Sequence, residues 1–252
     1  MQETITTALK RLEADRQVRI LYACESGSRA WGFPSPDSDY DVRFIYAHPT
    51  DWYFSIEERK DTIELPVNAL LDVGGWDIRK ALQQFRKSNS ALFEWLQSPI
   101  VYQENPEFTA DLRGLMPTYF APRAVVFHHL GLVRKMLEET EKDPDIRLKK
   151  IFYILRSLLS ASWVRENGTV PPMTFAPLRE LIQEKFMLDK VAEWLELKRQ
   201  SDEKTRVKKL PFFEEFVLME MARCEAYAES APVNKPNSDP LNQLFRKTVT
   251  GR

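Results

Sequence analysis

Residues 25–44 read ESGSRAWGFPSPDSDYDVRF and join two segments that are rich in apolar and β-branched residues. Upstream, residues 18–24 (VRILYAC) predict a buried strand, and downstream, residues 40–48 (YDVRFIYAH) predict the next strand. The segment between them is rich in Gly, Pro, Ser and Asp, which are typical of turns. The sequence therefore predicts a polar loop that runs straight into a strand carrying two carboxylates, Asp39 and Asp41.

Asp39 and Asp41 are separated by a single residue, Tyr40. Because successive side chains of a strand point to opposite faces, both carboxylates should lie on one face, with Cα atoms about 6.5–7 Å apart. Two like charges on one face repel, and a divalent cation between them removes that cost. Mg²⁺ prefers oxygen ligands, commonly a few carboxylates together with substrate phosphates. A hydrated aspartate turn over residues 36–39 is the alternative interpretation.

Gly27 and Ser28 follow the first predicted strand directly, which favours a phosphate site. A glycine lets the backbone approach a phosphate closely, and a serine adds a hydroxyl donor to the exposed N–H groups of a turn. Arg29 and Arg43 flank the motif, and either could neutralise a phosphate. Arg43 should project to the same strand face as the two aspartates. An ion pair with one of them is therefore an equal alternative to phosphate binding by Arg43.

Asp72 lies near the end of a third predicted strand, NALLDV (residues 68–73), which Gly74-Gly75 is expected to end. If this strand lies beside the acidic strand, about 4.8 Å away, three carboxylates could surround two metal ions. Two ions suit in-line phosphoryl or nucleotidyl transfer. Spacing alone leaves two alternatives open: an exposed strand-end aspartate at position 72, and Asp77 as the third carboxylate.

These residues carry a resemblance. Gly27-Ser28, the loop and Asp39-Tyr40-Asp41 resemble the signature of the DNA polymerase β-like nucleotidyltransferase superfamily. More closely, ESGSRAWGFPSPDSDYDVRFIY is similar to predicted nucleotidyltransferases of the YcgL/RlaP type, some of which are associated with RNA repair. Residues 72–99 and 149–173 also resemble this family, although Ser90 stands where its members often have proline.

The resemblance implies an enzyme of the EC 2.7.7 type, which moves a nucleoside monophosphate from an NTP to an acceptor hydroxyl and releases pyrophosphate. Gly27 and Ser28 would hold the β/γ-phosphates, and Asp39 and Asp41 would bind two Mg²⁺ ions, for which Mn²⁺ is a substitute. The resemblance over residues 72–99 favours Asp72 over Asp77 as the third carboxylate. Asp72 would bind the catalytic ion and help to deprotonate the acceptor hydroxyl.

An RNA 3′ end is the acceptor that the family association favours, with tRNA or a broken RNA end as examples. The alternatives are nucleotidylation of a protein or small molecule, as by a toxin–antitoxin component, and a catalytically silent nucleotide-binding module. The formal net charge of −1 excludes a whole-molecule attraction for nucleic acid. Two basic runs, residues 79–87 and 198–209, are candidates for local phosphate contacts or for solvated surface.

The apolar pattern predicts an α+β fold, in which a small mixed β-sheet with helices is followed by an all-α C-terminal domain. We expect a nucleotidyltransferase catalytic domain over residues 1–110 and, over residues 111–230, a helical domain that closes the nucleotide and acceptor cleft. The proline-rich, polar residues 231–252 predict a flexible tail.

Lys149, Tyr153 and Arg156 fall on one stripe of a predicted helix in the C-terminal half. Such a cationic and aromatic stripe could bind the nucleotide, and a solvated helix face is the alternative. Trp31 and Phe33 are expected to pack and brace the loop.

The chain has 252 residues, of which 43% are hydrophobic, as expected for a globular protein. No apolar run approaches the ~20 residues that a membrane span needs. Cys24 and Cys224 are far apart in sequence and predict buried free thiols. We therefore expect a cytoplasmic protein without a membrane partner, whose oligomeric state the sequence does not indicate.

Overall fold

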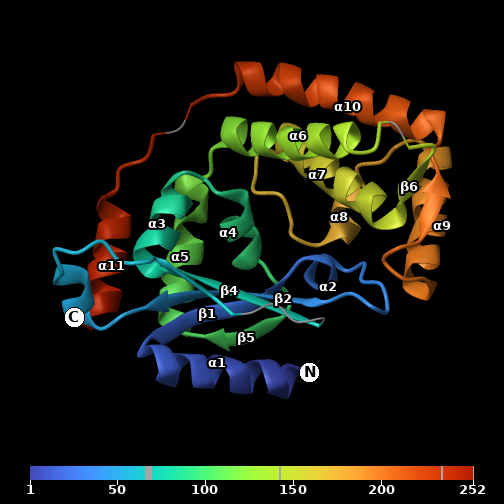
Figure 1. The fold of residues 1–252 in the computed structure, drawn as a ribbon. Coiled ribbons are helices and arrows are strands. Elements are labelled where there is room, and N and C mark those ends of the chain that lie inside the picture. Colours follow the sequence, from blue (N-terminus) through green and yellow to red (C-terminus); the bar gives the residue numbers. More distant parts are fainter. Residues whose placement is uncertain (66–69, 142, 234, 252) are drawn as a thin grey trace. The chain divides into compact units, whose positions relative to one another are not determined.

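The computed structural model describes residues 1–65, 70–141, 143–233 and 235–251. It contains two compact units, which are described separately below. Unit 1 comprises Met1–Ala30, Asp39–Tyr119 and Lys235–Arg252, and unit 2 comprises Trp31–Ser38 and Phe120–Asn234. Figure 1 shows the elements in chain order.

Unit 1 is built on a five-stranded mixed sheet in the order β3-β4-β2-β1-β5. The strands are β1 (Arg19–Ser26), β2 (Tyr40–Ala47), β3 (Thr62–Glu64), β4 (Leu71–Asp77) and β5 (Val101–Glu104). Strands β2 and β4 run parallel, and the other neighbours run antiparallel. The first two predicted strands are therefore confirmed.

The third predicted strand starts later and ends later than the sequence suggests. Residues 68 and 69 of its predicted range lie outside the described residues, and β4 begins at Leu71. The strand passes through Gly74-Gly75, which was expected to end it, and continues to Asp77. A Cβ at Gly75 would meet the Phe44 ring at 2.3 Å, so this glycine allows an aromatic side chain of β2 to lie across β4.

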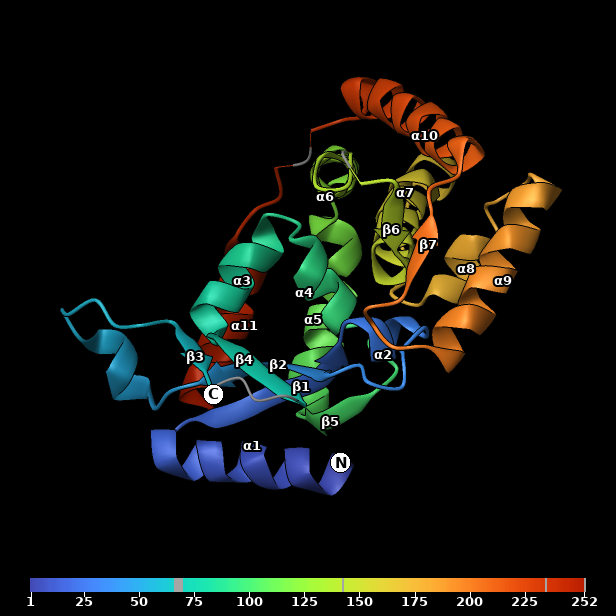
Figure 2. The ribbon, with the colours of Figure 1, turned by 45° about the vertical axis from the view of Figure 1, so that its right-hand side comes forward.

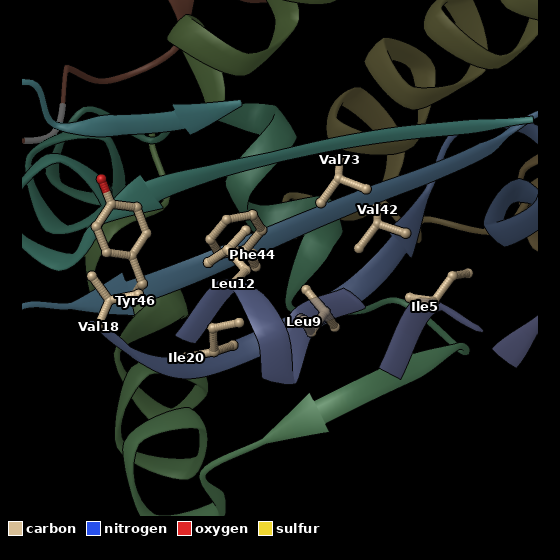
Figure 3. Packing of buried hydrophobic residues seen from close by; sticks show 10 residues of the cluster. Ile5, Leu9, Leu12, Val18, Ile20, Val42, Phe44, Tyr46 and Val73 are labelled. Carbon is tan, nitrogen blue, oxygen red and sulfur yellow. The ribbon is translucent and has the colours of Figure 1, made fainter. Parts of the chain in front are cut away.

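Helix α1 (Gln2–Arg16) packs on one face of this sheet. Its buried side chains Ile5, Leu9 and Leu12 join a core cluster with side chains of the sheet (Figure 3). From β2 that cluster takes alternate residues, including Val42 and Phe44. Asp41 and Arg43, which alternate with these residues along β2, therefore belong to the other face.

The other face of the sheet carries α3 (Ile78–Arg86), α4 (Ser90–Trp95) and α5 (Pro106–Tyr119) (Figures 1 and 2). A short 3₁₀ helix, η1 (Thr50–Phe54), follows β2. Helix α3 is amphipathic and buries Ile78, Leu82 and Phe85, and the side chain of Asp77 caps its first turn.

The C-terminal segment differs from the predicted flexible tail. Residues Asp239–Thr250 form helix α11, which packs on α3 and α5. Leu241 and Leu244 are buried, and Lys247 pairs with Asp111 at 2.8 Å. Proline and polar residues before residue 241 dominate the composition and hide this short apolar stripe.

Unit 2 is mostly helical. Its elements are α6 (Pro122–Glu138), α7 (Leu148–Asn167), α8 (Phe175–Arg179), α9 (Lys185–Gln200) and α10 (Pro211–Ser230), with a two-stranded sheet of β6 (Asp145–Arg147) and β7 (Arg206–Lys208). Together with the sheet of unit 1, these helices confirm the predicted α+β class. Among the described helices, none has both the length and the apolar character to cross a bilayer.

Candidate functional site

The parallel pairing of β2 and β4 brings two of the predicted carboxylates side by side. Asp41 and Asp72 are register partners, so both side chains belong to the face opposite α1. Asp39 lies just before β2, and its charge contributes to the pKa of Asp41. The strand neighbourhood on which the three-carboxylate hypothesis depends is therefore present in unit 1.

Asp77, the rival third carboxylate, lies at the far end of β4 and has other partners. It is buried, accepts a hydrogen bond from the Arg79 N–H at 2.8 Å, and accepts another from the Tyr53 hydroxyl at 2.7 Å. It is the register partner of Tyr46. These contacts make Asp77 the N-cap of α3, and the geometry favours Asp72 as the neighbour of Asp41.

Arg43 lies between the two paired carboxylates. Its Nη2 is 2.7 Å from Asp72 Oδ2 and 3.7 Å from Asp41 Oδ1. Its Nη1 donates to the carbonyl oxygens of Val42 and Asp72 at 3.0 and 3.1 Å. The ion-pair interpretation of Arg43 thus describes this structure, and a phosphate would have to compete with Asp72 for its guanidinium.

The local charge remains unbalanced in spite of Arg43. Burial and the neighbouring charge of Asp39 raise the pKa of Asp41 to about 6, with Glu25 and Asp72 adding to the effect and Arg43 opposing it. An acid with a raised pKa is held in its charged form at a cost in free energy. A cation beside Asp41 would relieve that cost.

The chemistry of these side chains fits a hard divalent cation, because three carboxylates supply oxygen donors and negative charge. Within the described ranges, however, no group of three or more His, Cys, Asp or Glu side chains is arranged so that it could hold a metal ion. Arg43 stands between Asp41 and Asp72, so a cation shared by these two requires its guanidinium to move.

Glu25 is a site residue that the sequence analysis missed. It is 0% exposed, its Oε1 accepts the Asp41 N–H at 2.9 Å, and its Oε2 accepts the Tyr102 hydroxyl at 2.5 Å. Burial raises its pKa, although these hydrogen bonds oppose the shift. The available signal was an acidic residue near the end of a mostly apolar strand.

Replacing Glu25 with Ala is expected to destabilise unit 1 by about 2–4 kcal/mol, because the Asp41 N–H and the Tyr102 hydroxyl would lose a buried acceptor. Glu25→Gln keeps an acceptor for Asp41 and a donor for the Tyr102 oxygen, so its cost should be below about 1 kcal/mol. Chemical denaturation of both variants measures the difference. Equal losses would show that the charge of Glu25, and not its hydrogen bonds, maintains the strand.

Gly27 brings the glycine–serine part of the sequence motif into contact with its acidic part. It has φ +78°, and a Cβ built on it would lie 2.1 Å from Asp41 Oδ2, so the glycine backbone lies directly against that carboxylate. Ser28 is buried and begins the short helix α2 (Ser28–Trp31). Arg29 donates from Nε to the Asp39 carbonyl at 3.0 Å, and its guanidinium lies 3.8 Å from the centre of the ring of Tyr40.

The predicted stripe on α7 belongs to unit 2 and has partners there. Lys149 pairs with Glu203 at 2.7 Å. Arg156 is 5% exposed and lies 4.2 Å from the ring centre of Trp31, which Tyr153 meets edge-on at 5.2 Å. The nucleotide-binding role of this stripe remains a prediction, since these contacts satisfy a structural role equally well.

The loop over residues 31–38 also belongs to unit 2. Phe33 is buried and stacks on Phe152 at 5.2 Å, which together with the contacts of Trp31 confirms that these aromatic residues pack. Buried Lys198, the first residue of the second basic run, donates to Ser35 Oγ at 2.8 Å. At least this cation of the run is therefore structural.

A family model and a curated relative show the family of this chain, and a solved structure is also similar to it. A family model described as "RlaP: RNA repair pathway DNA polymerase beta family" matches residues 1–247. "Uncharacterized protein YcgL" of Bacillus subtilis (strain 168) is 42% identical over 251 residues, which is 99% of this chain and 96% of that protein. A solved structure, of a nucleotidyltransferase-like protein from Exiguobacterium sibiricum 255-15, has 11% identity and a TM-score of 0.34, and the match covers 98% of this chain and 80% of that one.

Proposed function

Because the chain belongs to the RlaP family of RNA repair pathway DNA polymerase beta proteins, we propose that it is an Mg²⁺-dependent nucleotidyltransferase. It would move a nucleoside monophosphate from an NTP to the 3′ hydroxyl of an RNA. The observation that carries the proposal is the pairing of Asp41 with Asp72, with Gly27 packed against the Asp41 carboxylate.

We propose the roles that the family's sequence signature suggests, and the positions of these residues in unit 1 support them. Asp39, Asp41 and Asp72 would hold the metal ions, which when bound stabilise the charge that develops on the transferred phosphate. Gly27 and Ser28 would hold the β/γ-phosphates through backbone N–H groups and the hydroxyl. Asp72, whose side chain is 32% exposed, would accept the proton of the attacking hydroxyl.

Arg43 would have two positions in this scheme. Without a cation it neutralises Asp72, as the 2.7 Å ion pair shows. With a cation between the carboxylates it would be displaced, and its guanidinium could then pair with a phosphate of the NTP. Such an exchange keeps the charge of the acidic face balanced in both states.

Incubation of the full chain with each α-labelled NTP, Mg²⁺ and total cellular RNA tests the proposal. We expect label to appear in RNA, with release of pyrophosphate, and to disappear when EDTA is added. The Asp39→Ala/Asp41→Ala double variant is expected to give no label, since it removes two of three metal ligands.

The same reaction in a cell lysate distinguishes the acceptors. Label in a protein or small molecule instead of RNA would assign a different acceptor to the same chemistry. An increase in melting temperature with NTP and Mg²⁺ but no pyrophosphate would indicate a nucleotide-binding module without turnover. Undiminished labelling by the double variant would overturn the proposed metal site.

A further inference from the structure

A groove of about 550 Å³ lies between α3 and α11 in unit 1. Its lining includes three cations, Arg79, Arg86 and Lys87, and among its described lining residues there is no acidic side chain. Figures 1 and 2 show the two helices next to each other. In a chain whose formal net charge is −1, this is a local concentration of positive charge that suits an anionic ligand.

The cations of the groove are accessible. The side chains of all three belong to exposed residues. Arg86 donates to Ser238 Oγ at 3.0 Å, which leaves other N–H groups of its guanidinium for a ligand. Arg79 lies 5.6 Å from the ring centre of Phe245, so the groove has an aromatic wall as well as charge.

The neighbouring cavity is different and helps to define the ligand. It measures about 380 Å³, shares Arg79 and Gln83 with the groove, and is lined by four carboxylates, including those of Asp61 and Asp77, and by three cations, Arg59, Arg79 and Lys80. Lys80 pairs with Asp61 at 2.9 Å and lines this cavity instead of the groove. An anionic ligand is therefore favoured in the groove over the cavity beside it, because only the groove has cations without carboxylates.

The groove is too far from the acidic site to bind the same small ligand. Helix α3 begins after Asp77, five residues beyond Asp72 on β4, which at the usual strand rise is about 17 Å. A single NTP held at the three aspartates would have to span about 17 Å to reach Arg79 at the start of α3, whereas a chain of several nucleotides spans that distance.

We propose that the α3–α11 groove binds the phosphate backbone of the single-stranded RNA acceptor, several nucleotides from its reacting end; this rests on the proposed function. Single strands bind in cationic grooves with aromatic side chains, where bases stack and phosphates meet Lys and Arg. The polar amides of Gln83 and Asn242 line the same groove and can meet ribose or base edges.

Binding of a fluorescent 20-nucleotide single-stranded RNA to the full chain, measured by anisotropy at several salt concentrations, tests this inference. Arg86→Gln/Lys87→Gln should raise Kd at least about tenfold at low salt. It should also lower the slope of log Kd against log salt by about 1.4, since two phosphate contacts are lost at about 0.7 each for single strands.

The control variant is Lys10→Gln/Arg11→Gln, which removes the same charge from two exposed residues of α1 on the other face of the sheet. It should change Kd less than about twofold. Circular dichroism of both variants checks that they fold. Equal effects of the two variants, or no effect of the groove variant, would overturn the groove assignment.

Two further outcomes separate this inference from the proposed function. If RNA binds through the groove but no nucleotide is transferred, the groove assignment is supported and the proposed chemistry is wrong. If the wild-type chain does not bind the RNA even at low salt, the groove assignment is wrong. Transfer to a different acceptor would then leave the proposed chemistry intact.

Discussion

Replacing Asp41 with Asn is expected to reduce the rate of nucleotidyl transfer by at least about a thousandfold, because a metal-bound carboxylate accounts for several kcal/mol of charge stabilisation. The substitution keeps the shape of the side chain, removes its charge and replaces one acceptor oxygen with an NH2 group. Single-turnover labelling with the best NTP and acceptor measures the rate. A variant that retains the wild-type rate would show that Asp41 does not hold a catalytic ion.

The same substitution is expected to stabilise the metal-free protein. The folded chain binds a proton at Asp41 up to about pH 6, whereas the unfolded carboxyl releases it near 3.8. Stability should therefore fall as pH rises between these values and then stay constant. For a side chain that is 24% exposed, Asn should recover on the order of 2 kcal/mol above pH 6 and nothing below pH 4.

Thermal unfolding in EDTA between pH 4 and pH 8 measures this gain, which corresponds to about 4–8 °C for a chain of this size. Asp189→Asn, at an exposed position on α9, is the control and should change neither the rate nor the melting temperature. An Asp41→Asn variant that is less stable than the wild type at pH 8 would contradict the view that charge repulsion dominates at this position.

The acidic site was predictable where it depends on strand geometry alone. Alternation along β2 separates Asp41 from the core residues Val42 and Phe44, and the position of Asp72 in the following strand allowed the two carboxylates to meet. The parallel pairing itself required the sequence resemblance or the structure. Without it, Asp77 was an equal candidate, because sequence spacing does not show that its carboxylate caps a helix.

Residues whose roles depend on partners distant in the chain were not predictable. Glu25 becomes part of the site only because β1 pairs with β2 and because Tyr102 of β5 lies within hydrogen-bond distance. Lys149 and Arg156 follow a helical stripe that suggests ligand binding, yet each meets a partner within unit 2. Periodicity indicates which side chains share a face, and it does not identify what that face contacts.

Gly27→Ala is expected to reduce the rate about a hundredfold and to destabilise unit 1 by about 3 kcal/mol. The new Cβ would lie 2.1 Å from Asp41 Oδ2, so either the carboxylate or the backbone must move. A shift of about 1 Å at a metal ligand is enough for the loss of rate. Labelling rates and chemical denaturation measure the two effects.

Gly32→Ala is the control that separates two effects of Gly27→Ala: the close contact of the new Cβ with Asp41, and the strain of an alanine at positive φ. Gly32 has φ +91°, so Ala there is at least as strained as at Gly27, but no described atom lies within 4 Å of the added Cβ. This variant should lose about 1–2 kcal/mol from strain and keep a rate close to that of the wild type. If both variants lose activity to the same extent, the conformation of the loop matters for catalysis and the close approach of Gly27 to Asp41 does not. If only Gly27→Ala loses activity, a glycine is needed at position 27 because any side chain there would displace the Asp41 carboxylate.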